Sequence, residues 1–168
     1  MLKKLILLPM LLGLIGCVCS DFSNAKSMIH SGEAECVIVR NGKIAAFEKG
    51  RGISPLLKLY DEKSELMQGS IVVDKVIGRA AAFIVIKGGA SEVYGKIMSE
   101  DAKILLEKHN VKVSCNLLVP YILNNQRNGL CPLEDSVKNI TAVDEAIAAM
   151  RQRISDLRKG IVFNTTLP

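Results

Sequence analysis

The sequence contains no tryptophan, and aromatic residues make up only 4% of its 168 residues. A hydrophobic core must therefore consist mainly of Val, Ile, Leu and Ala side chains. Proteins that bind single-stranded nucleic acid usually stack the bases on exposed aromatic rings, so this class is disfavoured. The net charge is +5 and no block of like charges concentrates it. We therefore expect no nucleic-acid partner.

Catalytic and metal-binding signatures are also missing. The sequence has no paired CxxC, no HExxH, no GxSxG, no phosphate-binding loop and no dinucleotide fingerprint. We expect neither a cofactor nor a metal site. A disulfide framework is not expected in a domain with so much aliphatic core. The five cysteines are Cys17, Cys19, Cys36, Cys115 and Cys131.

The N-terminal segment, residues 1–20, resembles an export leader. Two lysines precede an apolar run over residues 5–15, which is too short to cross a bilayer comfortably and matches a signal peptide. The run ends in Leu-Ile-Gly-Cys, like the lipobox of bacterial lipoproteins, so Cys17 is a candidate for lipidation. We expect an exported or membrane-anchored lipoprotein. The alternatives are an uncleaved anchor, or translation from near Met28 and a cytoplasmic protein.

The length suits one domain with extensions. Residues 21–33 read as a linker or short helix, and residues 34–138 as an α/β domain. The domain opens with a β-hairpin over residues 35–39 and 44–47 around the Asn41-Gly42 turn signal. Helices and strands then alternate: a helix over 55–65 with Ser54 as N-cap, a strand over 70–73 that ends at Asp74-Lys75, a helix over 78–86, a strand over 92–98, a helix after Ser99, and a strand over 111–118.

Residues 139–168 form a C-terminal extension. A capping-box-like start at Thr141 introduces an amphipathic helix that reaches about residue 157 and is followed by a tail. Four basic residues lie close together in this segment. They contact anions or a membrane surface, or they form an ordinary solvent-exposed helix face. They are Arg151, Arg153, Arg158 and Lys159.

Polar residues follow the strands at the places where ligands bind in open α/β sheets, which are the carboxyl ends of the strands near helix N-termini. An acid, two bases, amides and a thiol on one edge would suit a polar or anionic ligand. The candidate ligand-binding residues are Asp74, Lys75, Gly78, Arg79, Ser99, Glu100, Asn124, Asn125, Cys131 and Glu134.

Each candidate also has a structural interpretation. Asp74-Lys75 can be a turn at a strand end, and Ser99 can be only a helix cap. Asn124 and Asn125 can serve turn geometry. Cys131, before a proline, is a candidate nucleophile if a helix N-terminus lowers the pKa of its thiol, but the sequence places no catalytic partner beside it.

Four segments carry a resemblance to a known family. They are residues 74–82 (DKVIGRAAA), 92–94 (EVY), 118–122 (LVPYI) and 131–134 (CPLE). In this order they are similar to DUF1893, a family of bacterial and archaeal proteins of unknown function with a cytidine-deaminase-like fold. The resemblance covers residues 34–138. It implies a three-layer α-β-α sandwich with an N-terminal hairpin and a mixed sheet of about five strands.

The resemblance does not extend to deaminase chemistry. A zinc deaminase places its metal ligands and a glutamate at two helix starts, whereas this chain has Gly78-Arg79-Ala80 and Ser99-Glu100-Asp101 there. Our first hypothesis is a domain without a zinc site that binds a small polar or nucleotide-like ligand. The second is a cysteine-dependent enzyme that uses Cys131 with Glu134 or Glu100. The third is a membrane-tethered structural or interaction domain. A homo-oligomer is compatible with each.

Overall fold

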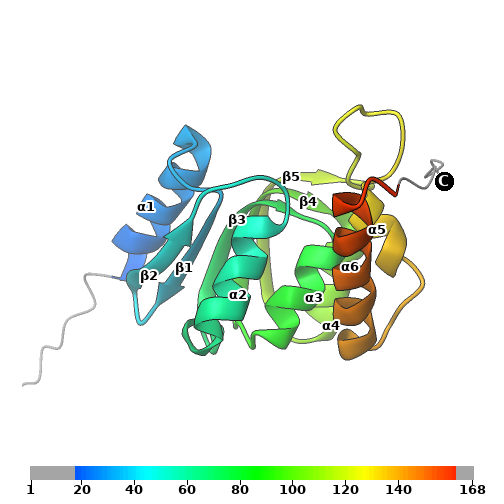
Figure 1. The fold of residues 1–168 in the computed structure, drawn as a ribbon. Helices are drawn as coiled ribbons and strands as arrows, with labels where there is room; N and C mark the ends of the chain where they lie inside the picture. Colours follow the sequence, from blue (N-terminus) through cyan, green and yellow to red (C-terminus); the bar gives the residue numbers. More distant parts are fainter. Residues whose placement is uncertain (1–17, 162–168) are drawn as a thin grey trace, which may run out of the picture.

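A computed structural model describes residues 18–161 of the chain (Figure 1). The leader up to Cys17, with its expected lipidation site, and residues 162–168 lie outside the described part. The elements in chain order are α1 (Val18–Ser31), β1 (Cys36–Arg40), β2 (Lys43–Glu48), α2 (Ser54–Met67), β3 (Ile71–Ile77), α3 (Arg79–Lys87), β4 (Glu92–Ser99), α4 (Glu100–Lys108), β5 (Lys112–Val119), α5 (Pro132–Val137) and α6 (Val143–Arg158).

The predicted hairpin is confirmed. Strands β1 and β2 pair antiparallel, and the turn between them places Asn41 at φ 52° and Gly42 at φ 73°. Two consecutive residues with positive φ define the tight turn that matches the twist of a hairpin, and Asn-Gly adopts it at the lowest steric cost. The local sequence thus fixes the register at the start of the sheet.

Strand β3 is longer than the sequence indicated. Asp74 and Lys75 do not end it, because the strand continues to Ile77 and Asp74 pairs with Cys36 on one side and Gly95 on the other. The side chain of Asp74 accepts a hydrogen bond from the Val76 amide at 2.9 Å, which accommodates a polar residue inside the strand. The predicted strand end was therefore wrong, and Asp74 belongs to the sheet itself.

Two predicted helix caps are also wrong. Ser54 is the first residue of α2, the preceding Ile53 is the N-cap, and no side chain caps that end. Helix α6 begins after Ala142, again without a side-chain cap, so Thr141 does not form a capping box. The predicted cap of α4 is confirmed, since the Ser99 hydroxyl accepts from the Ala102 amide at 3.2 Å.

The five strands form one mixed sheet in the order β2-β1-β3-β4-β5. Strand β1 is antiparallel to both of its neighbours, and β3, β4 and β5 are parallel. Helices α2, α3 and α4 follow successive crossovers in one direction, and because such crossovers are right-handed they lie on the same face of the sheet. Helix α1 covers the other face, so the fold is a three-layer α/β sandwich (Figure 1).

The core lies mainly between the sheet and α2, α3 and α4, with Phe83, Ile84 and Leu106 among its most buried side chains. A smaller cluster beneath α1 includes Ala25, Ile29 and Val73. Helix α6 packs against α3 and α5 at the outer side of the helical layer (Figure 1). No helix within residues 18–161 is both long enough and apolar enough to cross a membrane.

Candidate functional site

The N-terminus of α3 holds a carboxylate from a distant part of the chain. Glu134, on α5, accepts a hydrogen bond from the Arg79 amide at 2.7 Å and a second from the Ala80 amide at 3.0 Å. These are two of the N–H groups that a helix leaves without internal partners at its start. The positive end of the helix dipole favours a negative charge at the same place. The chain therefore places its own carboxylate where a helix binds an anion.

Gly78 makes room for this carboxylate. A Cβ atom at position 78 would lie 2.4 Å from Oε1 of Glu134, closer than non-bonded atoms approach. The backbone of Gly78 is extended, with φ −98° and ψ −177°, so its conformation does not itself require glycine. The glycine is needed because the carboxylate comes so close.

Arg79 fixes the segment that carries Glu134. Its Nε donates to the Val137 carbonyl at 3.1 Å, and one terminal nitrogen donates to the Ile140 carbonyl at 2.7 Å. Val137 is the last residue of α5, and Ile140 lies in the segment that follows this helix. The guanidinium also lies over the Phe83 ring at 5.3 Å. Arg79, predicted as a ligand-binding residue, is thus engaged within the protein.

Asp74 is a deeply buried carboxyl group within β3, with 6% of its surface exposed. Burial raises the pKa of Asp74 to about 7, although the Val76 amide and the Cys36 thiol act in the opposite direction. Burial also raises the pKa of the Cys36 thiol well above its usual value, and the neighbouring carboxyl raises it further. Asp74 therefore changes protonation near neutral pH while Cys36 stays a thiol.

Cys131 is the residue that precedes α5. Burial raises the pKa of its thiol, and the amides of Leu133 and Glu134 offset this only in part. A thiol with a raised pKa contains little of the thiolate that attacks a substrate.

The remaining candidates near α3 and α4 differ in their surroundings. Strands β3 and β4 end side by side, because Ile77 pairs with Met98. Ser99 is buried and acts as the cap of α4, whereas Glu100 is exposed at the first position of that helix.

Desolvation raises the pKa of Glu134, and the charge of Asp101 adds to this rise.

Three predicted residues lie apart from this group. Lys75 extends to the surface and pairs with Glu35 at 2.9 Å. Asn124 bonds through its side chain with Asn128 at 2.8 Å and closes a loop over residues 124–129. Asn125 is exposed in the same loop. For these positions the structure supports the turn or surface interpretation more directly than a role in ligand binding.

The zinc ion of deaminases does not fit this edge. The two helix starts carry Gly78-Arg79-Ala80 and Ser99-Glu100-Asp101, and these residues offer no thiolate or imidazole. The space beside Gly78 is filled by the Glu134 carboxylate, which already binds two amides. Within residues 18–161 no three His, Cys, Asp or Glu side chains are grouped so that they could hold a metal ion. We derive no chemical step through zinc.

The sequence analysis missed a second polar group, on the α1 face of the sheet. Nε2 of His30 lies 2.8 Å from the Tyr94 hydroxyl, and Nζ of Lys26 lies 4.6 Å from the centre of the Phe22 ring. The apolar spacing of residues 22, 25, 28 and 29 was the available signal that this segment is an amphipathic helix. The partner on β4 cannot be found from spacing, because residues 30 and 94 meet only through the sheet.

Comparisons with known proteins agree with the family resemblance. A family described as a domain of unknown function (DUF1893) matches residues 24–154, which is well over half of the chain and includes most of α1 and α6. The crystal structure of a DUF1893 family protein from Thermotoga maritima is similar, with a TM-score of 0.71 and 22% sequence identity over 79% of this chain and 88% of that one. No curated protein matches the chain. The chain belongs to the DUF1893 family.

Proposed function

We propose that this protein is a binding module without a catalytic zinc site, of the cytidine-deaminase-like type, which takes a small polar or nucleotide-like ligand at the carboxyl edge of its sheet. The observation that carries the proposal is the Glu134 carboxylate on the first amides of α3. It supports the proposal because the chain's own carboxylate already occupies this edge. A ligand phosphate or carboxylate would use the same two amides after Glu134 moves away.

The hydrogen bonds that Glu134 loses in such an exchange are matched by those that the ligand forms. The carboxylate loses two charge-assisted hydrogen bonds on leaving, and an incoming oxyanion forms two of the same kind. The pKa of Glu134 is raised by desolvation, so the carboxylate gains hydration when it moves into water. Helix α5 has only six residues, and Val137 at its end is buried in the core, so the exchange we propose moves the Glu134 side chain and leaves α5 in place.

Asp74 would give this edge a response to pH. Its pKa of about 7 means that the carboxyl group is partly protonated under physiological conditions. A protonated Asp74 can donate a hydrogen bond, whereas an ionised Asp74 repels an anion. We therefore expect an anionic ligand to bind more tightly at pH 6 than at pH 8.

A thermal-shift series tests the proposal. The probes are nucleosides, nucleoside monophosphates and inorganic phosphate, applied to the wild-type protein and to Glu134→Gln. A ligand at one hundred times its dissociation constant stabilises by about 2.7 kcal/mol, which corresponds to a rise in Tm of several degrees. We expect a nucleoside monophosphate to raise the Tm of both proteins, and to do so at lower concentration in Glu134→Gln, where the competing charge is absent.

Asp135→Asn is the matched control, because it removes one carboxylate from the same helix without touching α3. Asp135 instead pairs with Lys138 at the surface. The proposal is contradicted if no probe raises the Tm of either protein. It is also contradicted if Glu134→Gln and Asp135→Asn respond to the probes alike.

A further inference from the structure

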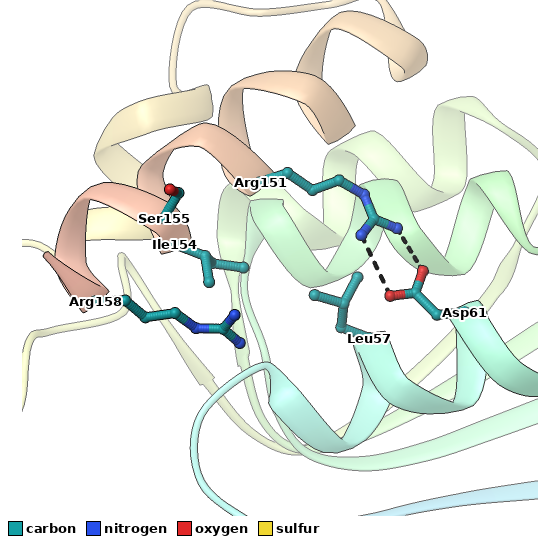
Figure 2. A pocket seen from close by; sticks show the side chains of 6 residues that line it. All are labelled: Leu57, Asp61, Arg151, Ile154, Ser155 and Arg158. Atoms are coloured by element: carbon teal, nitrogen blue, oxygen red, sulfur yellow. Dashed lines mark hydrogen bonds and ion pairs between the residues drawn. The ribbon is translucent and has the colours of Figure 1, made fainter.

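A shallow groove lies between α2 and α6, and Glu134 is not among the residues that line it (Figure 2). Its volume is about 250 Å³, smaller than the 300–1,000 Å³ typical of pockets that enclose drug-sized ligands. It therefore has room for one ring or a short branched chain. It is lined by Leu57 and Asp61 from α2, and by Arg151, Ile154, Ser155 and Arg158 from α6.

The charges in the groove are not balanced. Arg151 holds Asp61 through two hydrogen bonds, one of them 3.2 Å long, and both groups are neutralised in this pair. Arg158 extends from α6 across the groove toward Leu57 (Figure 2). Within residues 18–161 the Arg158 guanidinium makes no hydrogen bond or ion pair. The groove thus carries one cation in excess.

The floor between the two guanidinium groups is apolar. Leu57 and Ile154 lie between the Arg151–Asp61 pair and Arg158, and both are half-buried (Figure 2). An arginine guanidinium group can bind a carboxylate through two parallel hydrogen bonds. An apolar group attached to that carboxylate would cover the two aliphatic side chains.

We propose that this groove binds a small organic carboxylate, with its oxygens on the Arg158 guanidinium and its apolar body on Leu57 and Ile154. A single negative charge matches the one excess cation. A dianion such as a phosphate monoester fits less well, because the fixed carboxylate of Asp61 lies at the other end of the groove. This site is separate from the proposed ligand edge, and neither proposal depends on the other.

Benzoate is the probe for this proposal, since it combines one carboxylate with one ring. The measurement is an NMR titration of the arginine Nε–H signals of the full chain, with benzyl alcohol as the neutral analogue and inorganic phosphate as the anion without an apolar body. A ligand of this size is expected to bind with a dissociation constant of about 1 mM. We expect benzoate to shift the Arg158 signal in a saturable way, and to bind at least tenfold more tightly than either comparison compound.

Arg158→Gln tests the charge, and Lys159→Gln is its matched control. Both substitutions remove one positive charge from the end of α6, but only Arg158 lines the groove. We expect Arg158→Gln to weaken benzoate binding about tenfold or more, the loss of a hydrogen-bonded charge, and to change Tm by less than one degree. Lys159→Gln should weaken binding less than twofold.

Three results would overturn the proposal. The first is that benzoate at 20 times the expected dissociation constant, about 20 mM, shifts no signal from the groove. The second is that Arg158→Gln and Lys159→Gln weaken binding equally, which would mean that Arg158 contributes only to the general charge of the helix end. The third is that phosphate binds as tightly as benzoate, which would remove the role of Leu57 and Ile154.

Discussion

Helices α3 and α4 begin side by side at one edge of the sheet, yet their N-termini are capped in different ways. The cap of α4 is local: the Ser99 hydroxyl accepts from the Ala102 amide three residues later. The cap of α3 comes from Glu134, whose carboxylate accepts from amides 55 and 54 residues earlier in the chain. The first cap belongs to its helix, and the second ties that helix to α5.

The difference separates a structural device from a site that can exchange its occupant. A serine cap belongs to the same turn as the helix that it caps, so it is a fixed part of the local fold. The Glu134 carboxylate belongs to a separate six-residue helix, and under the proposed function a soluble anion of the same chemistry would replace it. For this reason we place the ligand at α3 and treat α4 as support.

The largest expected effect is that of Glu134→Ala. This substitution leaves two amides of α3 without their charged acceptor, and each hydrogen bond to a charged group contributes about 1.5–3 kcal/mol. We expect the free energy of unfolding in urea to fall by about 3 kcal/mol, a value at the lower end of that range for two bonds. Asp135→Ala, which removes only a surface pair, should cost less than about 1 kcal/mol.

Gly78→Ala tests whether the Glu134 carboxylate lies against Gly78. In the wild-type protein the new Cβ meets the Glu134 carboxylate at 2.4 Å, so the two groups cannot keep their places. In the Glu134→Ala background the space is empty and the extended backbone accepts alanine. The double-mutant cycle should therefore show strong coupling. Equal costs of Gly78→Ala in both backgrounds would show that the carboxylate does not lie against this glycine.

The next effect is a pH dependence caused by Asp74. Its pKa of about 7 in the folded protein lies above the ~3.9 of an unperturbed aspartate. Between these values the folded state binds more protons than the unfolded state, so the free energy of unfolding falls as the pH rises. The stabilisation is complete below about pH 4 and is lost as the pH passes 7. From pH 5 to pH 8 the loss amounts to about 2–3 kcal/mol.

Urea unfolding of Asp74→Asn measures this contribution, because asparagine keeps the shape without the titration. The decline of stability from pH 5 to pH 8 should be about 2–3 kcal/mol smaller in Asp74→Asn than in the wild-type protein. Asp135→Asn should retain the wild-type decline, since Asp135 pairs at the surface. A wild-type slope in Asp74→Asn would mean that Asp74 is ionised throughout this range.

The smallest effect is expected at the local cap. Ser99→Ala removes the side-chain acceptor of α4 and should lower the free energy of unfolding by about 1 kcal/mol. It should leave ligand-induced changes in Tm unaltered, because Ser99 only supports its own helix. If Ser99→Ala abolished these changes while Glu134→Gln did not, the roles assigned to the two helix starts would have to be exchanged.

Local signals were sufficient for most of the fold. The Asn41-Gly42 turn and the Ser99 cap each depend on neighbouring residues, and both predictions are confirmed. Two local predictions were wrong, the caps at Ser54 and Thr141, because these helices begin without a side-chain cap. The other error arose where tertiary contacts determine the structure. Asp74 looked like the end of a strand, but pairing with Cys36 and Gly95 continues the strand through it.

The sequence predicted which residues belong to the candidate site. It did not predict the contacts that these residues make with one another. The general position of ligands in α/β sheets brought Gly78, Arg79, Cys131 and Glu134 into one group, and the structure places them together around α3 and α5. Their mutual roles depend on contacts between residues more than 50 positions apart, such as the 58 between Arg79 and Val137. Nothing in local spacing shows that the carboxylate binds amides or that the guanidinium binds carbonyls.

An amide NMR titration of Glu134→Gln with adenosine monophosphate tests the central claim most directly. The account predicts saturable shifts of the Arg79 and Ala80 amide signals, the two groups that hold Glu134 in the wild-type protein, with the same shifts at higher ligand concentration in Asp135→Asn. If the nucleotide stabilises the protein while these two signals stay in place, the ligand binds elsewhere and the account is wrong.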